Sequence, residues 1–100
     1  MKRIKLSKIV AFEWDEGNSS KNWEKHKVSQ KECEYVFSHN PIVLSDLTHS
    51  QKEDRFIAIG KVDKRYLFII YTIRNNCIRI ISARDQNKKE KMFYHNKRKI

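Results

Sequence analysis

The second half of the chain consists of three apolar runs separated by very short polar connections, and this pattern constrains the fold more than any other feature. The runs at residues 55–60, 66–73 and 77–83 are rich in β-branched and aromatic side chains, which predicts three strands. Residues 63–64 predict a turn, and Asn75-Asn76 predicts a tight one because Asn tolerates a positive φ. Connections this short join antiparallel strands, so we expect a meander. The runs are almost continuously apolar, which predicts that both faces of these strands are covered.

The first half of the chain predicts two helices between two short strands. β-branched and aromatic residues indicate strands at residues 9–14 and 42–44. Asp15 is suited to cap a helix, because its carboxylate can accept a hydrogen bond from a backbone N–H. Residues 16–20 have poor helix propensity, so we expect a loop there and a helix over residues 21–26.

A capping signal defines the second helix. Ser29 and Glu32 have the spacing of a capping box, in which each side chain accepts a hydrogen bond from an otherwise unpaired backbone N–H of the first turn. The residue before a proline disfavours helical backbone, so Asn40-Pro41 is expected to end the helix. The apolar face of this helix is predicted to carry Cys33, Val36 and Phe37.

Asp85 is expected to cap a last helix over residues 86–96, with Met92 and Phe93 facing the sheet. The predicted order of elements is then a strand, two helices, four strands and a helix. This order indicates a small single α+β domain over residues 1–100, with helices packed on an antiparallel sheet of four to five strands.

Length and composition exclude several classes of protein. With 100 residues and 39% hydrophobic residues, the chain can build one compact core and no large fold. Its longest apolar run, residues 66–71, is too short to span a bilayer, and its basic start has no apolar stretch of the kind found in secretory signals. Cys33 and Cys77 are far apart and are expected to be reduced thiols. We therefore expect a cytoplasmic protein with no membrane partner.

The formal net charge of +10 is concentrated at the two ends of the sequence. Residues 1–10 carry four cations and no anion, while residues 84–100 carry seven cations and two anions, so these ends hold +9 of the total. A basic extension over residues 1–8 and a basic tail over residues 96–100 are part of this excess. The distribution predicts a polyanionic partner, either nucleic acid or an acidic protein, unless the ends are simply solvated.

Four internal arginines are candidates for binding phosphate, because the planar guanidinium offers a fork of donors. Arg79 interrupts an otherwise apolar strand, where a cation is costly unless it is paired or solvated, and Arg84 closes the same strand. Arg55 begins a strand and Arg74 lies beside the Asn75-Asn76 turn. The alternative for each of them is a structural ion pair with the acidic middle of the chain.

Few other side chains suggest chemistry. His26, after Lys25, either interacts with the C-terminal end of a helix or transfers protons, since the unperturbed pKa of His is about 6.5. Tyr71 and Tyr94 either stack on bases or pack in the core. Cys33 lies on an apolar helix face, where core packing is favoured over a role as nucleophile. The histidines and cysteines have no close ligand spacing and there is no glycine-rich phosphate loop, so no metal or other cofactor is expected.

A set of short motifs in this order resembles the BrnT family of ribonuclease toxins, which belong to type II toxin–antitoxin modules. The set spans about four-fifths of the chain, and its most specific part is the string from Ile78 to Arg84 placed after Lys25-His26-x-Val28. The motifs are Phe12-Glu13-Trp14-Asp15, Asn22, Lys25-His26-x-Val28, Val36-Phe37, Arg55-Phe56-x-x-Ile59-Gly60, Thr72, Ile78-Arg79-Ile80-Ile81-Ser82-Ala83-Arg84 and Glu90-x-x-x-Tyr94.

The resemblance implies a RelE-like fold, endoribonuclease activity without a metal, and inhibition by a BrnA-type ribbon–helix–helix antitoxin. It also implies an even-numbered assembly, in which a toxin homodimer forms part of a toxin–antitoxin heterotetramer. Together with residue type, it assigns proton transfer to His26 or Lys25, with Tyr94 as a lesser candidate, and stabilisation of the phosphorane to Arg79 and Arg84. The further RNA contacts are then expected from Arg55, Arg74, Lys88 and Lys91.

Two other classes of function remain open at this stage. The same basic surface would serve a non-catalytic nucleic-acid-binding module, or a module that binds only an acidic protein. The chain also departs from the family in two places. Lys27 stands where family members often have Gly, a residue suited to a left-handed helix end. The basic extension before Ile9 is longer than the usual start of the family.

Overall fold

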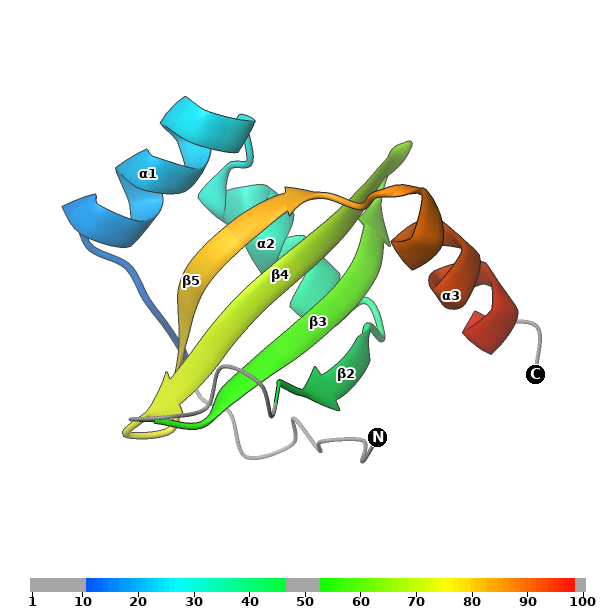
Figure 1. Cartoon of the computed structure of the whole chain (residues 1–100). Helices are drawn as coiled ribbons and strands as arrows, with labels where there is room; N and C mark the ends of the chain where they lie inside the picture. Colours follow the sequence, from blue (N-terminus) through cyan, green and yellow to red (C-terminus); the bar gives the residue numbers. More distant parts are fainter. Residues whose placement is uncertain (1–10, 47–52, 99–100) are drawn as a thin grey trace.

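The computed structural model describes residues 11–46 and 53–98, and it builds them around one five-stranded sheet with three helices (Figure 1). The basic extension 1–8, the first residues of the predicted strand 9–14, the loop around residues 48–52 and the last residues of the basic tail lie outside the described residues. In chain order the elements are β1 (Ala11–Glu13), α1 (Glu16–His26), α2 (Gln30–Ser38), β2 (Ile42–Ser45), β3 (Arg55–Val62), β4 (Arg65–Arg74), β5 (Cys77–Asp85) and α3 (Lys88–Arg98).

The predicted meander of β3, β4 and β5 is confirmed, and β2 extends it by pairing antiparallel to β3. Asn75 and Asn76 have φ values of 50° and 62°, as the tight turn requires. The fifth strand departs from the prediction, because β1 pairs parallel to β5 at the edge of the order β1-β5-β4-β3-β2. The sheet is therefore mixed and not purely antiparallel.

A bulge interrupts the pairing of β4 with β5. Ile70 pairs with Ser82 and Tyr71 pairs with Ile80, so Ile81 is an extra residue on β5. Ile80 and Ala83 are three residues apart, and both are nevertheless buried in one hydrophobic cluster. The bulge thus shifts the alternation of side chains along β5 by one residue.

α1 begins at Glu16, so the prediction of a loop over residues 16–20 is wrong. The helix starts there because Asp15 and Asn18 cap it reciprocally: each backbone N–H donates to the other residue's side-chain oxygen, at 2.8 and 3.0 Å. The buried Asn18 amide also donates to the backbone oxygens of Glu13 and Ile80. These tertiary hydrogen bonds tie the first turn to β1 and β5 and override the weak local propensity.

The capping box predicted for α2 is confirmed, since Ser29 and Glu32 make both hydrogen bonds. Between the helices, Lys27 has a φ of 55°, which is the left-handed conformation that a Gly would adopt more easily. α3 begins at Lys88 and is capped by Asn87, which exchanges hydrogen bonds with Glu90. The predicted cap Asp85 is wrong, because that residue is the last of β5.

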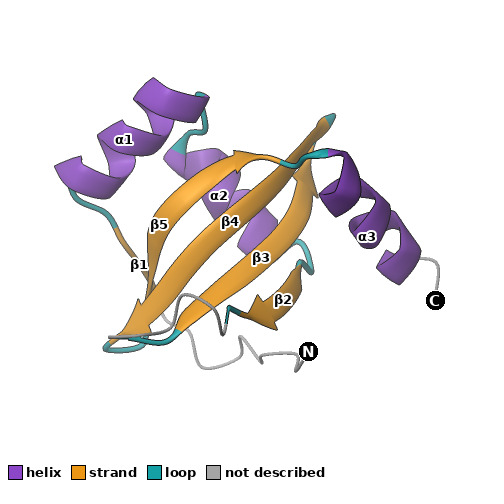
Figure 2. Cartoon of the chain, viewed as in Figure 1, coloured by secondary structure: helices purple, strands orange, loops and turns teal. Residues whose placement is uncertain are grey.

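The two faces of the sheet are covered unequally (Figure 2). α2 packs against β3 on one face, where Val28, Cys33 and Val36 join the main core. The approach is close at Gly60, where an added Cβ would lie 2.7 Å from Cγ1 of Val36. On the opposite face, which we call the open face, α3 is the described helix that packs, through Phe93 and the buried Tyr94. The prediction that Met92 faces the sheet is wrong, since Met92 is 58% exposed.

Candidate nucleic-acid interface

The register of the strands shows which side chains share the open face, because directly opposed residues in a sheet project from the same side. Three rows of neighbouring side chains cross this face. They are Ile42, Ile59, Phe68 and Arg84; Leu44, Ile57, Ile70 and Ser82; and Arg55, Thr72, Arg79 and Glu13.

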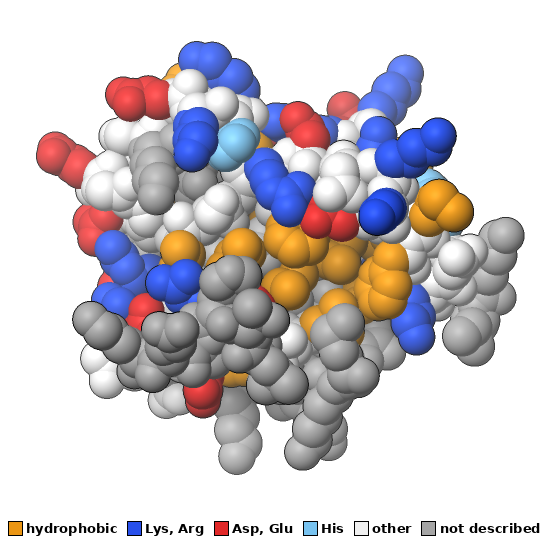
Figure 3. Space-filling model, in the orientation of Figure 1, with side chains coloured by type: hydrophobic (Ala, Val, Ile, Leu, Met, Phe, Trp, Pro, Cys, Tyr) orange, Lys and Arg blue, Asp and Glu red, His pale blue; other side chains and the backbone are white. Residues whose placement is uncertain are grey.

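All four arginines predicted from the sequence lie on the open face. Arg55 and Arg79 flank Thr72 in one row, and Arg84 lies opposite Phe68 in another. Arg74 pairs with Cys77 and also alternates onto this face. Figure 3 shows the face, with hydrophobic side chains gathered beside α3 and blue Lys and Arg side chains around them. A sheet face that carries several guanidinium groups is suited to a polyanion.

Three of these arginines form structural ion pairs: Arg74 and Arg79 with carboxylates from the acidic middle of the chain, as in the alternative interpretation, and Arg84 with Glu90. Arg79 contacts the carboxylates of Glu13 and Asp15, with N–O distances of 3.0 and 2.8 Å. Arg74 contacts Glu53 at 3.0 Å and is itself exposed. Arg79 therefore holds the start of α1 to β5, and any RNA contact that it makes has to share the guanidinium with these carboxylates.

Arg84 is held rigidly at the opposite end of β5. Glu90 binds its guanidinium through two parallel contacts of 2.8 and 2.9 Å, and the guanidinium lies 4.3 Å from the centre of the Phe68 ring. Burial opposes ionisation of Glu90, but hydrogen bonds from Arg84 and from the Asn87 backbone lower the pKa of this carboxyl. The Arg84 side chain remains 34% exposed, so a phosphate on the open face can reach it.

Arg84 and Arg79 are not brought together. Their partners on β4, Phe68 and Thr72, are four residues apart, which corresponds to about 13 Å along the strand. The two guanidiniums therefore suit successive parts of one RNA strand better than a single phosphate.

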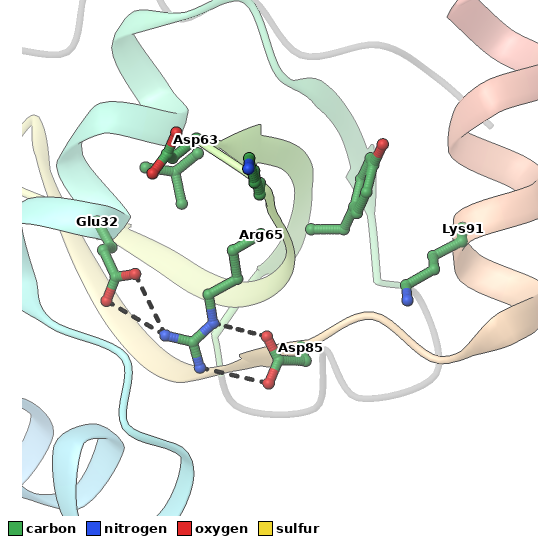
Figure 4. Close-up of a pocket in the computed structure, with 8 residues that line it drawn as sticks. Glu32, Asp63, Arg65, Asp85 and Lys91 are labelled. Carbon is green, nitrogen blue, oxygen red and sulfur yellow. Dashed lines mark hydrogen bonds and ion pairs between the residues drawn. The ribbon is translucent and has the colours of Figure 1, made fainter.

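Arg65, which the sequence did not single out, organises the end of the sheet beside α1 (Figure 4). It makes two hydrogen bonds to the Asp85 carboxylate, at 2.6 and 3.3 Å, and contacts Glu32 at 3.2 Å. It also donates to the backbone oxygens of His26 and Lys27, at 2.8 and 2.7 Å. These contacts use all five guanidinium N–H groups, so Arg65 is a structural clamp that joins β4, β5 and the junction of α1 with α2.

Two of the predicted site residues, His26 and Lys91, lie near Asp85. The pKa of the Asp85 carboxyl is lowered, chiefly by the hydrogen bond from Arg65. Lys91 and His26 contribute to the same effect through their electrostatic interaction with Asp85. His26 is half-buried at the end of α1, while Lys25, Lys88 and Lys91 are exposed. A cavity of about 540 Å³ opens here, and Glu32, Asp63, Lys64, Tyr66 and Lys91 contribute to its lining. Figure 4 shows Lys91 reaching from α3 towards Asp85.

Tyr94 is buried, in contrast to the exposed lysines Lys25, Lys88 and Lys91. Its side chain is buried in the cluster on the open face, and its ring contacts Tyr66 and the guanidinium of Arg98. The buried hydroxyl of Tyr71 has no hydrogen-bond partner within the described residues. Burial raises the pKa of the Cys33 thiol to about 12, so the thiol stays protonated at neutral pH.

Two further features concern the described residues only. None of their helices is long and apolar enough to cross a bilayer. In residues 11–46 and 53–98, no three His, Cys, Asp or Glu side chains are grouped in a way that could hold a metal ion.

The fold and the arginine-bearing face define a small α+β domain with several guanidinium groups on one face of its sheet. The profile of one family, described as the ribonuclease toxin, BrnT, of type II toxin–antitoxin systems, matches residues 14–90. The chain belongs to this family, so the resemblance seen in the sequence is confirmed. Comparison with curated proteins gave no match, and comparison with solved structures gave none either. The RelE-like character of the fold therefore stays a prediction.

Proposed function

We propose that this chain is an endoribonuclease toxin that cleaves RNA without a metal ion, arrests translation in the cytoplasm and is neutralised by a BrnA-type ribbon–helix–helix antitoxin. Membership of a family of ribonuclease toxins supports the general class. The observation that carries the proposal is the arginine-bearing open face, because RNA offers the matching line of phosphates.

The proposed reaction uses the 2′-OH of the substrate as the nucleophile. A base removes the proton of this hydroxyl, the oxygen attacks the adjacent phosphorus, and an acid protonates the 5′-oxygen that leaves. Arg84 binds the phosphorane, whose extra negative charge makes this interaction stronger in the transition state than in the ground state. His26 or Lys25 transfers protons beside Asp85, and Tyr94 is the lesser candidate for this role.

The RNA strand is proposed to follow β5, where Arg79, Ser82 and Arg84 project from the open face. Lys88 and Lys91 of α3 extend the positive charge beyond Arg84. Further phosphate contacts are assigned to Arg55 and Arg74. A Lys contributes a point charge to a phosphate, whereas an Arg fixes its orientation through two donors.

The test is RNA cleavage by purified protein in EDTA. Arg84→Ala is expected to lower the rate by about 10²–10³-fold, which is typical of losing one donor to a developing charge. Arg84→Lys should restore the rate only in part, because it lacks the fork. Met92→Ala is the control, since this exposed side chain faces away from the sheet. Wild-type protein that binds RNA and leaves it intact would identify a non-catalytic binding module.

A pH series separates the proton-transfer role from mere binding. If His26 transfers a proton, the cleavage rate should depend on pH. His26→Gln should lower the rate and flatten that dependence, while leaving RNA affinity nearly unchanged. Loss of all activity in EDTA with recovery in Mg²⁺ would show a metal-dependent nuclease instead.

The mass of the complex with antitoxin, measured by light scattering, tests the proposed heterotetramer with its toxin homodimer.

A further inference from the structure

An apolar groove lies on the open face between the sheet and α3. It has a volume of about 210 Å³, and its floor and walls are formed by Leu44, Ile57, Ile59, Phe68 and Phe93. Ile57, Phe68 and Phe93 are only partly buried, so the groove leaves apolar surface uncovered by the described elements. This is the orange area beside α3 in Figure 3.

Cations surround the groove. The Arg84 guanidinium lies against the Phe68 ring, and Lys97 lies 5.7 Å from the centre of the Phe93 ring. Lys89 lines the mouth from α3, where Glu90 is the acidic neighbour and is itself paired with Arg84. A ligand that suits this site combines an apolar group for the groove with negative charge for its rim.

Charge argues against two occupants that the protein itself could supply. The sequence of residues 1–8 contains four cations and no anion, so it would bring positive charge to a positive rim. A second copy of the chain has a net charge of +10, so its charge does not complement the cationic rim of this groove.

The lining also argues against a nucleobase. Four of the five apolar residues named above come from the sheet, and three of them are aliphatic. A base binds by stacking on aromatic rings and by hydrogen bonds to its polar edges, and this groove presents almost no polar surface. An aliphatic or aromatic side chain of a protein fits better, because it needs no hydrogen-bond partner.

We infer that the groove receives an apolar anchor side chain from an acidic segment of the antitoxin. This inference rests on the proposed function, since it names where the inhibitor of that same face binds. An anchor beside Phe68 would place the neighbouring acidic residues over Arg84, 4.3 Å from the same ring. The segment would then exclude RNA from Arg84 without filling the cavity near Arg65.

The experiment measures two properties of each variant: its affinity for the antitoxin purified from the adjacent reading frame, and its RNA cleavage in the absence of antitoxin. Phe93→Ala removes the helix wall of the groove and Ile57→Thr makes its floor polar while keeping a β-branched residue. Met92→Ala is the matched control on α3. Thermal melting of each variant shows whether it is folded.

For both groove variants we expect antitoxin affinity to fall by about 10–100-fold, in line with the loss of a buried apolar anchor. Their RNA cleavage should stay near the wild-type rate, and Met92→Ala should change neither property. Unchanged antitoxin affinity in both folded groove variants would overturn the inference. Reduced RNA cleavage with unchanged antitoxin affinity would instead assign the groove to a nucleobase. Wild-type protein that binds antitoxin but never cleaves RNA would refute the proposed activity while leaving the groove testable.

Discussion

Replacing Arg65 with Met should destabilise the domain strongly, although the residue lies at the start of β4 and is partly exposed. The Arg65 side chain is 26% exposed, and it contacts Glu32, Asp85 and two backbone oxygens at the end of α1. Met keeps the apolar stem and removes every donor, so the change isolates the hydrogen bonds. Lys64→Met is the matched control, because this neighbouring cation is exposed.

The magnitude follows from how well each contact is shielded from water. A hydrogen bond to a charged group contributes about 1.5–3 kcal/mol when it is protected, whereas an exposed ion pair contributes about 0–1 kcal/mol. Asp85 is 62% exposed, so most of the effect comes from Glu32, which is 28% exposed, and from the two backbone oxygens. We expect the free energy of unfolding to fall by about 2–4 kcal/mol in urea titrations. In a domain of this size the melting temperature should fall by roughly 10–20 °C.

The effect of Arg65→Met should also depend on pH. Hydrogen bonds from Arg65 help to lower the pKa of Glu32 and of Asp85 below their ordinary values of 4.5 and 3.8, despite the opposing effect of burial. A depressed folded pKa contributes stability that is present above the unfolded pKa and is lost as the pH falls through the folded value. The difference between wild type and variant should therefore be largest at neutral pH and shrink below about pH 4. A difference under about 0.5 kcal/mol, or one equal to that of Lys64→Met, would refute the clamp.

Two further substitutions test the packing of the core, both by urea unfolding. Gly60→Ala should lower the free energy of unfolding by about 1–3 kcal/mol, because the added Cβ would overlap Val36 of α2; no loss would mean that α2 shifts freely. Tyr71→Phe should leave stability unchanged or raise it by about 1 kcal/mol, because it removes a buried hydroxyl that has no partner in the described residues. A clear loss of stability in Tyr71→Phe would show that the hydroxyl is satisfied.

The parts of the fold that depend on local pattern were predictable from the sequence. The meander and its tight turn follow from apolar runs and from Asn75-Asn76, and the start of α2 follows from its capping box. The parts set by tertiary contacts were not. α1 begins earlier than predicted because the Asn18 side chain donates hydrogen bonds to backbone oxygens of β1 and β5. The acceptor on β5, Ile80, is 62 residues further along the chain, and local propensity cannot identify a contact over that distance. The parallel pairing of β1 could not be predicted for a similar reason. Its partner, β5, is the last strand of the meander and lies far from β1 in the sequence.

The candidate site was predictable in residue type and not in arrangement. The sequence indicated Arg84 as the residue that closes an apolar strand, but not that Glu90 and Phe68 hold its guanidinium. It missed Arg65 entirely, because this residue lies between the predicted turn at residues 63–64 and the predicted strand at residues 66–73, where an arginine looks like an ordinary surface residue. The available signal was the presence of two carboxylates, Glu32 and Asp85, that need a cation. Both are distant from Arg65 in the sequence and come close to it only in the folded domain.

The bulge at Ile81 determines whether the open face can work as proposed. Arg79 and Arg84 are five residues apart, so in a regular strand they would project to opposite faces. The extra residue corrects this parity and places both arginines, with Ser82, on the open face. The same shift keeps Ile80 and Ala83 in the core on the other face. The proposed phosphate-binding line on β5 and the apolar groove over β3 and β4 thereby become neighbours, joined by the contact of Arg84 with Phe68. Under the proposed function, competition between RNA and an acidic, anchored inhibitor would follow from the register of one strand pair and would need no change in the fold.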